Sequence, residues 1–262
     1  YDESRHARTV AARFGTDHTE ARVESDALAV LPRLAWHYGE PFGDSSAIPT
    51  FHVSALAARH VKVVLSGDAG DELFLGYPRH AAAALADRIH GWPAPARWAL
   101  GAMRHAIPPS VGVHSRRRQM RKFLEDLGRP ADARFRDWVC VFPEADRLAL
   151  LQADRRVPQG FLEAYWEERR LHAEGAPAAA RAAGCDLAAY LPECLMTKVD
   201  IASMAHGLEV RCPFLDGPLV DWALGLPASW KMRFLRGKRI LRAHAARFLP
   251  PSLLWRRKQG FA

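Results

Sequence analysis

The stretch from residue 61 to residue 77 constrains the fold more than any other part of the chain. Residues 61–65 form a β-branched run with apolar flanks, which predicts a buried strand. Residues 66–72 then bring two glycines, a serine and three carboxylates, and an apolar helix-like segment resumes at Leu73. In α/β proteins this succession places backbone N–H groups and carboxylates at the carboxyl end of a parallel strand. Such a loop suits a magnesium-bound polyphosphate.

Each polar residue of this acidic loop has a candidate role. Asp71 can hold magnesium, and Asp68 can contact a substrate or the metal. The backbone of Ser66 and Gly67 can lie against a nucleotide. The alternative is a structural turn in which Asp71 only caps the next helix. The loop alone leaves both interpretations open, because short loops of glycine and aspartate are common.

Length and composition limit the classes of protein that the chain can belong to. The 262 residues are 49% hydrophobic, which suits one large domain or two small ones. No run of about 18 apolar residues exists, so we expect no membrane span, and the sequence shows no signal peptide. The cysteines have no paired metal-ligand spacing, which predicts reduced thiols in a cytoplasmic protein; they are Cys140, Cys185, Cys194 and Cys212.

The net charge of +8, from 37 basic and 29 acidic residues, is concentrated in two clusters. One lies at residues 116–122 and the other at residues 256–258. Such clusters can attract nucleic acid or a nucleotide. The first cluster has no interleaved aromatic residues, which favours a solvated helix face. Because base-reading motifs are also missing, we expect no nucleic-acid partner.

The first 78 residues are predicted to form the α/β part of the chain. Helices are expected at 3–14, from Ser25 or Asp26 to about 38, and at 49–59, with strands at 18–23 and 61–65. Pro32 can kink the second helix or mark its start. This order predicts parallel pairing through crossovers. Since a sheet normally has more strands, further strands are expected upstream of Tyr1.

Residues 79–262 are predicted to be mainly helical. The pattern is helical to about residue 184, and a long helix follows at 187–207 with a break near Pro192. A compact loop is expected at 208–216, and two more helices at 217–225 and 237–248.

A second segment, residues 195–211, places polar groups within an apolar helix. Lys198, Asp200 and Ser203 lie among apolar residues, and Asp200 and Ser203 share a helix face. Glu209 and Arg211 point to the same side if the chain is extended there, which favours a buried structural ion pair that fixes a loop. His206 is expected to pack or cap rather than to bind a metal, because no second ligand stands at ligand spacing.

The end of the chain forms a third segment of interest. Lys258 stands just before a short glycine-containing turn, and from such a loop its side chain can reach into a site. A cation there could stabilise charge that develops on a phosphate or a tetrahedral carbon. Composition alone would describe this segment as a solvated tail.

Together the three segments resemble one family. SGDAGDELFLGY at residues 66–77 is similar to the SGDGGDELFGGY signature of the C-terminal synthetase domain of the glutamine-hydrolysing asparagine synthetase family. The segments KVD and SMA at 198–205, GLEVRCPFLD at 207–216 and RKQGF at 257–261 match further signatures of that domain. Residues 1–4, 14–18, 40–42 and 47–50 also fit in order, so the resemblance spans the whole chain.

The resemblance implies an ATP-pyrophosphatase-type α/β fold, with a partial parallel sheet and a large helical remainder. In that family aspartate and MgATP give β-aspartyl-AMP and pyrophosphate, and ammonia from a separate glutaminase domain then gives asparagine. Carried over, Asp68 stands where the acyl-adenylate forms, Asp71 binds Mg²⁺, and Lys258 stabilises the transition state. The residues implied to bind ATP or substrate are Leu65, Ser66, Gly67 and Glu72. A homodimer is compatible with the resemblance.

The chain departs from the family pattern in several places. The Ser-Gly-Gly-x-Asp-Ser pyrophosphate loop and the glutaminase do not occur within residues 1–262, so this chain alone is expected not to bind ATP productively. Ala69 and Leu75 each replace a glycine, and Ile201 replaces an arginine or lysine. Ala69 is expected to be tolerated if its φ is negative.

Two alternatives to an asparagine-forming enzyme remain open. A relative of the same family could amidate a carboxylate of a polysaccharide or a peptide, since one fold hosts several functions. A non-catalytic interaction domain could keep the fold without the chemistry. The presence of Asp68, Asp71 and Lys258 argues against this second alternative.

Overall fold

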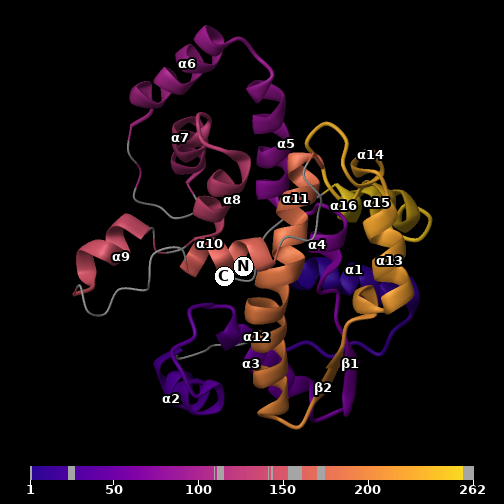
Figure 1. The fold of residues 1–262 in the computed structure, drawn as a ribbon. Coiled ribbons are helices and arrows are strands. Elements are labelled where there is room, and N and C mark those ends of the chain that lie inside the picture. Colours follow the sequence, from indigo (N-terminus) through magenta and orange to yellow (C-terminus); the bar gives the residue numbers. More distant parts are fainter. Residues whose placement is uncertain are drawn as a thin grey trace. The chain divides into compact units, whose positions relative to one another are not determined.

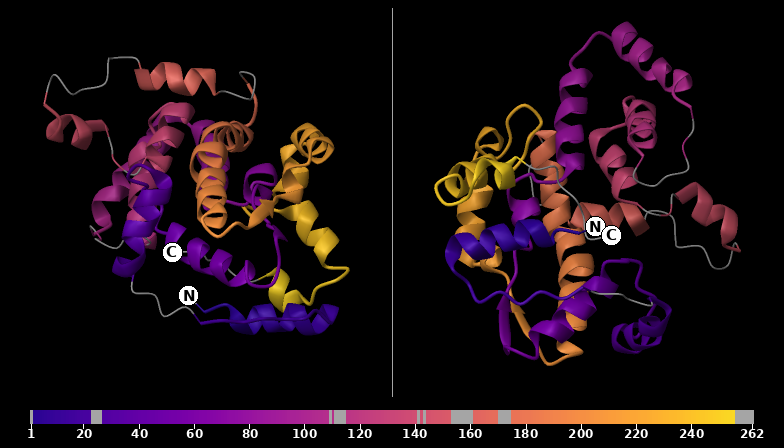
Figure 2. Two further views of the ribbon diagram at one scale, coloured as in Figure 1. Left: turned by 90° about the horizontal axis from the view of Figure 1, so that it is seen from below. Right: turned by 180° about the vertical axis from the view of Figure 1, so that it is seen from behind.

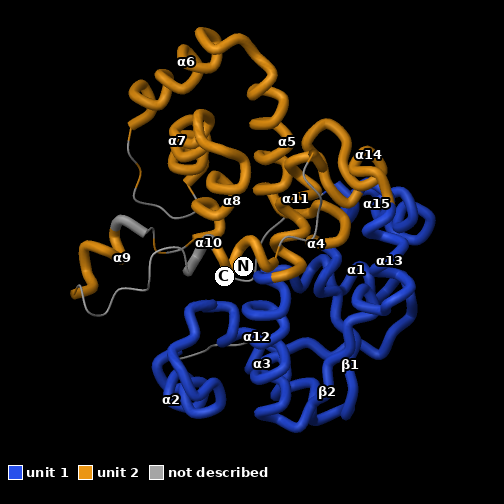
Figure 3. Tube along the Cα trace, in the orientation of Figure 1, with its two compact units in different colours: residues 1–70, 189–225, 239–262 blue, residues 71–188, 226–238 orange. Residues whose placement is uncertain are grey.

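The computed structural model describes residues 2–22, 27–108, 110, 115–140, 142, 144–152, 161–169 and 175–255. The chain forms two compact units (Figure 3). Unit 1 comprises residues 1–70, 189–225 and 239–262, and unit 2 comprises residues 71–188 and 226–238. The acidic loop is therefore shared: its residues up to Gly70 belong to unit 1, and Asp71 begins unit 2.

Unit 1 is built around a parallel pair of strands. β1 (Val63–Leu65) pairs with β2 (Glu209–Arg211), with Val63 opposite Glu209 and Leu65 opposite Arg211 (Figure 1). The helices of this unit are α1 (Ser4–Phe14), α2 (Ala27–Tyr38), α3 (Ala47–Ala57), α12 (Thr197–Met204), α13 (Gly217–Gly225), α15 (Arg239–Ala245), α16 (Pro251–Leu254) and the 3₁₀ helix η4 (Pro213–Leu215).

The core of unit 1 lies where α2, α3 and α12 meet. Val30 and Leu34, one turn apart on α2, are buried with Phe51 of α3 and Ala202 of α12. Elsewhere in this unit, α1 runs beside the segment 246–250, where Arg13 Nε donates to the carbonyl of Phe248 at 3.2 Å (Figure 2). The core thus fixes α12, which leads directly into β2.

The described secondary structure of unit 2 is helical, apart from one isolated antiparallel bridge between Arg233 and Arg236. Its helices are α5 (Pro78–His90), α6 (Ala94–Ala102), η1 (Met103–Ala106), α7 (Arg116–Asp126), α8 (Ala131–Val139), α9 (Glu144–Leu150), α10 (Phe161–Glu168), α11 (Ala178–Cys185) and α14 (Ala228–Lys231). A four-residue helix, α4 (Gly70–Leu73), stands at the boundary of the units, and the π-helix η3 (Asp186–Met196) passes through the boundary at 188/189.

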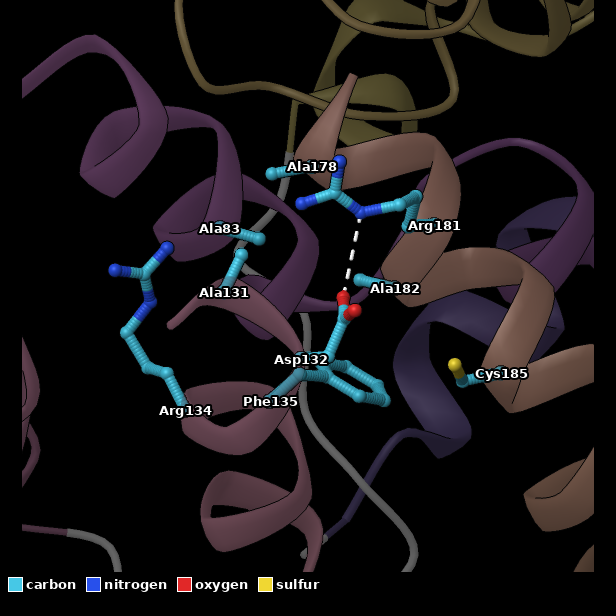
Figure 4. A pocket seen from close by; sticks show the side chains of 9 residues that line it. All are labelled: Ala83, Ala131, Asp132, Arg134, Phe135, Ala178, Arg181, Ala182 and Cys185. Atoms are coloured by element: carbon cyan, nitrogen blue, oxygen red, sulfur yellow. Dashed lines mark ion pairs between the residues drawn. The ribbon is translucent and has the colours of Figure 1, made fainter. Parts of the chain in front are cut away.

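The alanine-rich helix α11 packs closely on its neighbours because its facing side chains are small. Ala178 and Ala182 are buried with Ala83 of α5 and Phe135 of α8. A cavity of about 10 Å³ remains there, edged by the ion pair between Arg181 and Asp132 at 3.3 Å (Figure 4). That volume is the lower limit for one water molecule, so the cavity is a packing gap rather than a ligand site.

Much of the predicted secondary structure is confirmed. A strand lies within 61–65 and pairs in parallel, and every described secondary-structure element within 78–184 is a helix. α1, α2 and α3 match the three predicted N-terminal helices, with α3 starting two residues before Pro49. Gly15 adopts φ 61° and caps the C-terminus of α1. Ser25 and Asp26, the predicted caps of α2, lie outside the described residues.

Three expectations are wrong. Residues 18–22 form no strand; they are exposed, and Glu20 instead pairs with Arg8 at 2.6 Å. The strand at 61–65 is not buried, because among the described residues the sheet has only two strands, and Leu65 is 73% exposed. Pro192 does not break its helix, since the wider π turn accommodates the missing N–H.

The structure also adds an element that was not predicted. β2 lies within 208–216, where a loop was expected, and it falls in the part of the chain predicted to be mainly helical. Within the described residues, no helix is both long enough and apolar enough to span a membrane.

Candidate functional site

In unit 1, the first half of the acidic loop continues from the carboxyl end of β1. The N–H of Ser66 donates to the carbonyl of Arg211 at 2.8 Å, so the parallel ladder extends one residue beyond the strand. Ser66 Oγ donates to the Asp68 carboxylate, and the N–H of Asp68 donates back to Ser66 Oγ at 3.2 Å. The two side chains thereby fix a tight turn around Gly67.

The turn is exposed at Gly67, and the partly buried thiol of Cys212 lies near its Asp68 carboxylate. Gly67 is exposed, and a Cβ there would meet no described atom within 4 Å. Cys212 follows β2 directly, and partial burial, together with the nearby Asp68 carboxylate, raises the pKa of its thiol. The Gly67 backbone is thus accessible to a ligand, with the Asp68 carboxylate beside it.

The backbone at the two lost glycine positions keeps a glycine-like conformation. Ala69 has φ 68° and Leu75 has φ 57°. The condition under which Ala69 was expected to be tolerated, a negative φ, is therefore not met. A left-handed conformation costs an L-residue roughly 1–2 kcal/mol, which the packing around these two buried side chains must offset.

In unit 2, the Asp71 carboxylate forms an ion pair with Lys238, which the sequence did not predict. Lys238 Nζ lies 3.1 Å from Asp71 Oδ1. The N–H of Gly76 donates to the carbonyl of Asp71 at 2.7 Å, and the N–H of Lys238 donates to the carbonyl of Phe74 at 2.8 Å. Lys238 stands far from Asp71 in the sequence. The only feature of the sequence that could have indicated this contact is Gly237, directly before Lys238.

Glu72 is buried, with 1% of its surface exposed, and its carboxylate accepts a hydrogen bond from the Tyr77 hydroxyl at 2.6 Å. Burial raises the pKa of Glu72 above its ordinary value, despite that hydrogen bond. Its predicted contact with ATP or substrate stays a prediction, as does that of the exposed Leu65.

A second buried carboxylate, Asp186, was also missed. It accepts hydrogen bonds from Arg79 Nε at 2.8 Å and from His80 Nε2 at 2.7 Å, and both His80 and Asp186 are buried. Burial lowers the pKa of His80. A single aspartate within the apolar stretch after α11 was the sequence signal for this group.

The second predicted segment is anchored in unit 1 by Lys198. Its buried ammonium donates to Asp44 Oδ2 at 3.1 Å and to Ser46 Oγ at 2.8 Å, and Tyr38 donates to its carbonyl at 3.0 Å. Burial alone would raise the pKa of Asp44, but hydrogen bonds from Ser46 and the charge of Lys198 lower it below its ordinary value. The group ties α12 to the loop before α3.

Of the other polar residues of that segment, Ser203 is buried, whereas Asp200, Glu209 and Arg211 lie at the surface. Ser203 Oγ donates to the carbonyl of Asp200 at 3.1 Å, while the Asp200 side chain is exposed and makes no ion pair with a described residue. Arg211 Nε does lie 2.6 Å from Glu209 Oε1, with side chains 64% and 54% exposed. The two residues pair, but on a strand and in solvent rather than buried in a loop.

His206 packs against Phe51, with 4.3 Å between the ring centroids. It thus has the packing role that its sequence context predicts.

Comparison with known proteins decides the family. The family model described as asparagine synthase matches residues 1–262. The chain belongs to the asparagine synthase family. It is 30% identical to a putative glutamine-hydrolysing asparagine synthetase of Mycobacterium tuberculosis over 96% of this chain and 37% of that protein. It is 26% identical to the glutamine-hydrolysing asparagine synthetase 1 of Bacillus subtilis, over 97% of this chain and 39% of that protein.

A more distant relative is the amidase chry2 of Gibberella zeae, 25% identical over 89% of this chain and 36% of that protein. The chain thus spans less than two fifths of the length of these three relatives.

Among the family's implied functional residues, Lys258 and the rest of its segment lie outside the described residues. The donor set for a metal is small, since no group of three His, Cys, Asp or Glu side chains among the described residues could hold one. Magnesium often takes only one or two carboxylates and completes its coordination with substrate phosphates and water. Asp71, a carboxylate that already attracts a cation, fits one protein ligand in such a site.

Proposed function

We propose that this chain is the synthetase domain of a glutamine-dependent asparagine synthetase-like enzyme, with a sheet of the ATP-pyrophosphatase type. The enzyme adenylates the side-chain carboxylate of aspartate with MgATP and transfers ammonia to form asparagine, AMP and pyrophosphate. The observation that best supports this proposal is the Ser66–Asp68 turn, which continues from the parallel strand β1 and leaves the Gly67 backbone open.

The reaction divides into two displacements. A carboxylate oxygen of aspartate attacks the α-phosphorus of ATP, and the bond to the β-phosphate oxygen breaks, releasing pyrophosphate. Ammonia then attacks the activated carbonyl carbon, and AMP leaves with the oxygen that aspartate contributed. Both steps build negative charge on oxygens, so cationic groups and backbone N–H groups are the catalysts required.

The residues of this chain take complementary parts in that scheme. Ser66 and Gly67 lay their backbone against the nucleotide, where the missing side chain of Gly67 allows close approach. Asp68, held by Ser66, faces the forming acyl-adenylate, and Lys258 stabilises charge in the transition state. Asp71 holds magnesium, which supplies charge neutralisation for the pyrophosphate.

Ammonia is proposed to come from a glutaminase domain elsewhere in the protein, as the names of the bacterial relatives suggest. A cytoplasmic setting is consistent with the four free cysteines. The acceptor could be another carboxylate in the same two-step scheme, and the relative named amidase favours keeping this second candidate.

The test uses the full-length protein with MgATP, aspartate and either glutamine or ammonium chloride, and measures AMP, pyrophosphate and asparagine. We expect all three products in equal amounts, and Asp71→Asn to lower kcat by about 100-fold. The matched control is Asp221→Asn, an exposed aspartate of α13. Pyrophosphate release that needs a different carboxylate would replace aspartate as substrate. No pyrophosphate with any carboxylate would favour the non-catalytic interaction domain.

A further inference from the structure

Backbone strain in the described part of the chain gathers in two segments. The non-glycine residues with positive φ are Ala69, Leu75, Phe234, Leu235 and Lys238. The first two lie in the acidic stretch 66–77, and the other three lie within residues 233–238, which we call the basic hairpin. Strained backbone persists where the surrounding structure enforces it, and it is frequent at functional sites.

The basic hairpin turns on two residues that are poorly suited to it. Arg233 and Arg236 exchange both backbone hydrogen bonds, at 3.0 and 2.9 Å. Between them Phe234 and Leu235 have φ 49° and 61°, as in a type I′ turn, which strongly favours Asn-Gly. Phe234 is 79% exposed and Leu235 is 39% exposed, so burial of the tip does not explain the turn.

The packing at the base of the hairpin explains the strained turn better. There the backbone of the hairpin packs directly against the backbone of the acidic stretch. The N–H of Lys238 donates to the carbonyl of Phe74 at 2.8 Å. A Cβ at Gly237 would overlap the carbonyl oxygen of Leu75. A Cβ at Gly76 would overlap Asp71 Oδ1 and stand 2.6 Å from Lys238 Cε. Only glycine fits at position 237, where the obstructing atoms are backbone, whereas a Cβ at position 76 would have to displace the side chains of Asp71 and Lys238. Both glycines border the Asp71–Lys238 pair.

We propose that Gly76 and Gly237 are positioning residues, whose missing side chains let the basic hairpin hold the Lys238 ammonium on the Asp71 carboxylate. Lys238 thereby fixes the orientation in which Asp71 receives a cation-bound phosphate group. This inference rests on the proposed function, in which Asp71 is a metal ligand. Groups that orient a metal ligand typically change metal affinity by 10–100-fold when they are removed.

The experiment measures Mn²⁺ binding to the full-length protein by electron paramagnetic resonance, with ATP present, beside the urea unfolding midpoint. Gly237→Ala displaces the hairpin from Leu75, and Lys238→Met removes the ammonium while keeping the side-chain stem. We expect both to weaken Mn²⁺ binding about tenfold. The matched control is Gly217→Ala, where a Cβ would meet no described atom within 4 Å, and it should bind like the wild type.

Lys238→Met keeps the test valid if Gly237→Ala does not fold, since it leaves the backbone contacts unchanged. A folded Gly237→Ala protein with wild-type Mn²⁺ affinity would overturn the inference. Tighter binding in Lys238→Met would also overturn it, because Lys238 would then compete with the metal. If the wild-type protein binds no Mn²⁺ with ATP and releases no pyrophosphate, the proposed function itself fails, which is a different result.

Discussion

At the scale of single residues, the buried carboxyl group of Glu72 makes stability depend on pH. Its pKa in the folded state is raised from 4.5, mainly by burial. Folding therefore favours the protonated form, so this contribution is complete below pH 4.5 and is lost as pH rises through the folded pKa. The hydrogen bond from Tyr77 does not reverse this sign.

Glu72→Gln should remove this pH dependence and keep an acceptor for the Tyr77 hydroxyl. We expect the variant to unfold at higher urea concentrations than the wild type near neutral pH, with the difference shrinking as pH falls toward 4.5. Urea titrations across this range measure it. Glu125→Gln, at a glutamate paired with Arg121 at the surface, serves as the control and should track the wild type. If the urea unfolding midpoints of Glu72→Gln and the wild type changed in parallel with pH, the raised pKa of Glu72 would be contradicted.

Two ion pairs of this chain have the same chemistry and different surroundings. Lys198 and Asp44 have side chains 10% and 20% exposed, whereas Arg211 and Glu209 are 64% and 54% exposed. Removing one partner of a buried pair strands the other charge, while an exposed charge is solvated by water. Their contributions to stability should therefore differ.

Asp44→Asn should lower the free energy of unfolding by about 3 kcal/mol, and Lys198→Met by a similar amount. The double variant should recover part of this loss, because no charge is then left buried alone. Glu209→Gln should change stability by less than about 1 kcal/mol. Urea unfolding of all four variants measures the coupling. Equal losses for Asp44→Asn and Glu209→Gln would show that burial does not set the strength of these pairs.

At the scale of secondary-structure elements, the turn of the basic hairpin should be improvable while its base keeps the backbone contacts with the acidic stretch. The double variant Phe234→Asn with Leu235→Gly supplies the residues that a type I′ turn favours. It gives up the partly buried Leu235 side chain and the contact of the Arg233 guanidinium with the exposed Phe234 ring, 5.0 Å from its centroid. We expect a gain of about 1 kcal/mol in the free energy of unfolding. Met120→Gly, at an exposed helical position of α7, should instead lose about 1 kcal/mol. A loss in the hairpin variant would mean that its tip makes contacts beyond the turn.

Local sequence patterns predicted the elements that local physics determines. The β-branched run before the glycines gave β1, and Pro78 at the first turn of α5 marks the start of the helical region. β2 was missed because three residues, Glu209–Arg211, carry too little pattern to distinguish a strand from a loop. The alternating sequence pattern at residues 18–22 predicted a strand that does not form. A strand also needs a hydrogen-bonded partner, and these residues pair with neither of the described strands.

The candidate site was predicted only as far as its residues are neighbours in sequence. Ser66, Asp68 and Asp71 follow one strand, so their proximity is given by the chain. Lys238 meets Asp71 through the approach of two glycines, and Asp44 meets Lys198 through the packing of α3 on α12. Such pairs depend on tertiary contacts, which one sequence does not reveal.

At the scale of the whole molecule, the two units share one chain that passes between them repeatedly. The crossings fall at 70/71, 188/189, 225/226 and 238/239. The crossing at 188/189 lies inside the continuous helical run of η3 and α12. If unit 1 unfolded, one end of that helical run would lose its support. The chain segments at the other three crossings would also be held at one end only. A cooperative unit normally extends across such continuous elements.

Amide hydrogen exchange of the full-length protein tests this cooperativity, because peptides from α3 report on unit 1 and peptides from α5 report on unit 2. Asp44→Asn lies in unit 1, and a loss of about 3 kcal/mol corresponds to roughly 100-fold faster exchange through global opening. We expect the slowest amides of both α3 and α5 to accelerate by the same factor. The control Glu209→Gln should change neither. Acceleration confined to α3 would show that unit 1 unfolds while unit 2 stays folded, despite the shared helix.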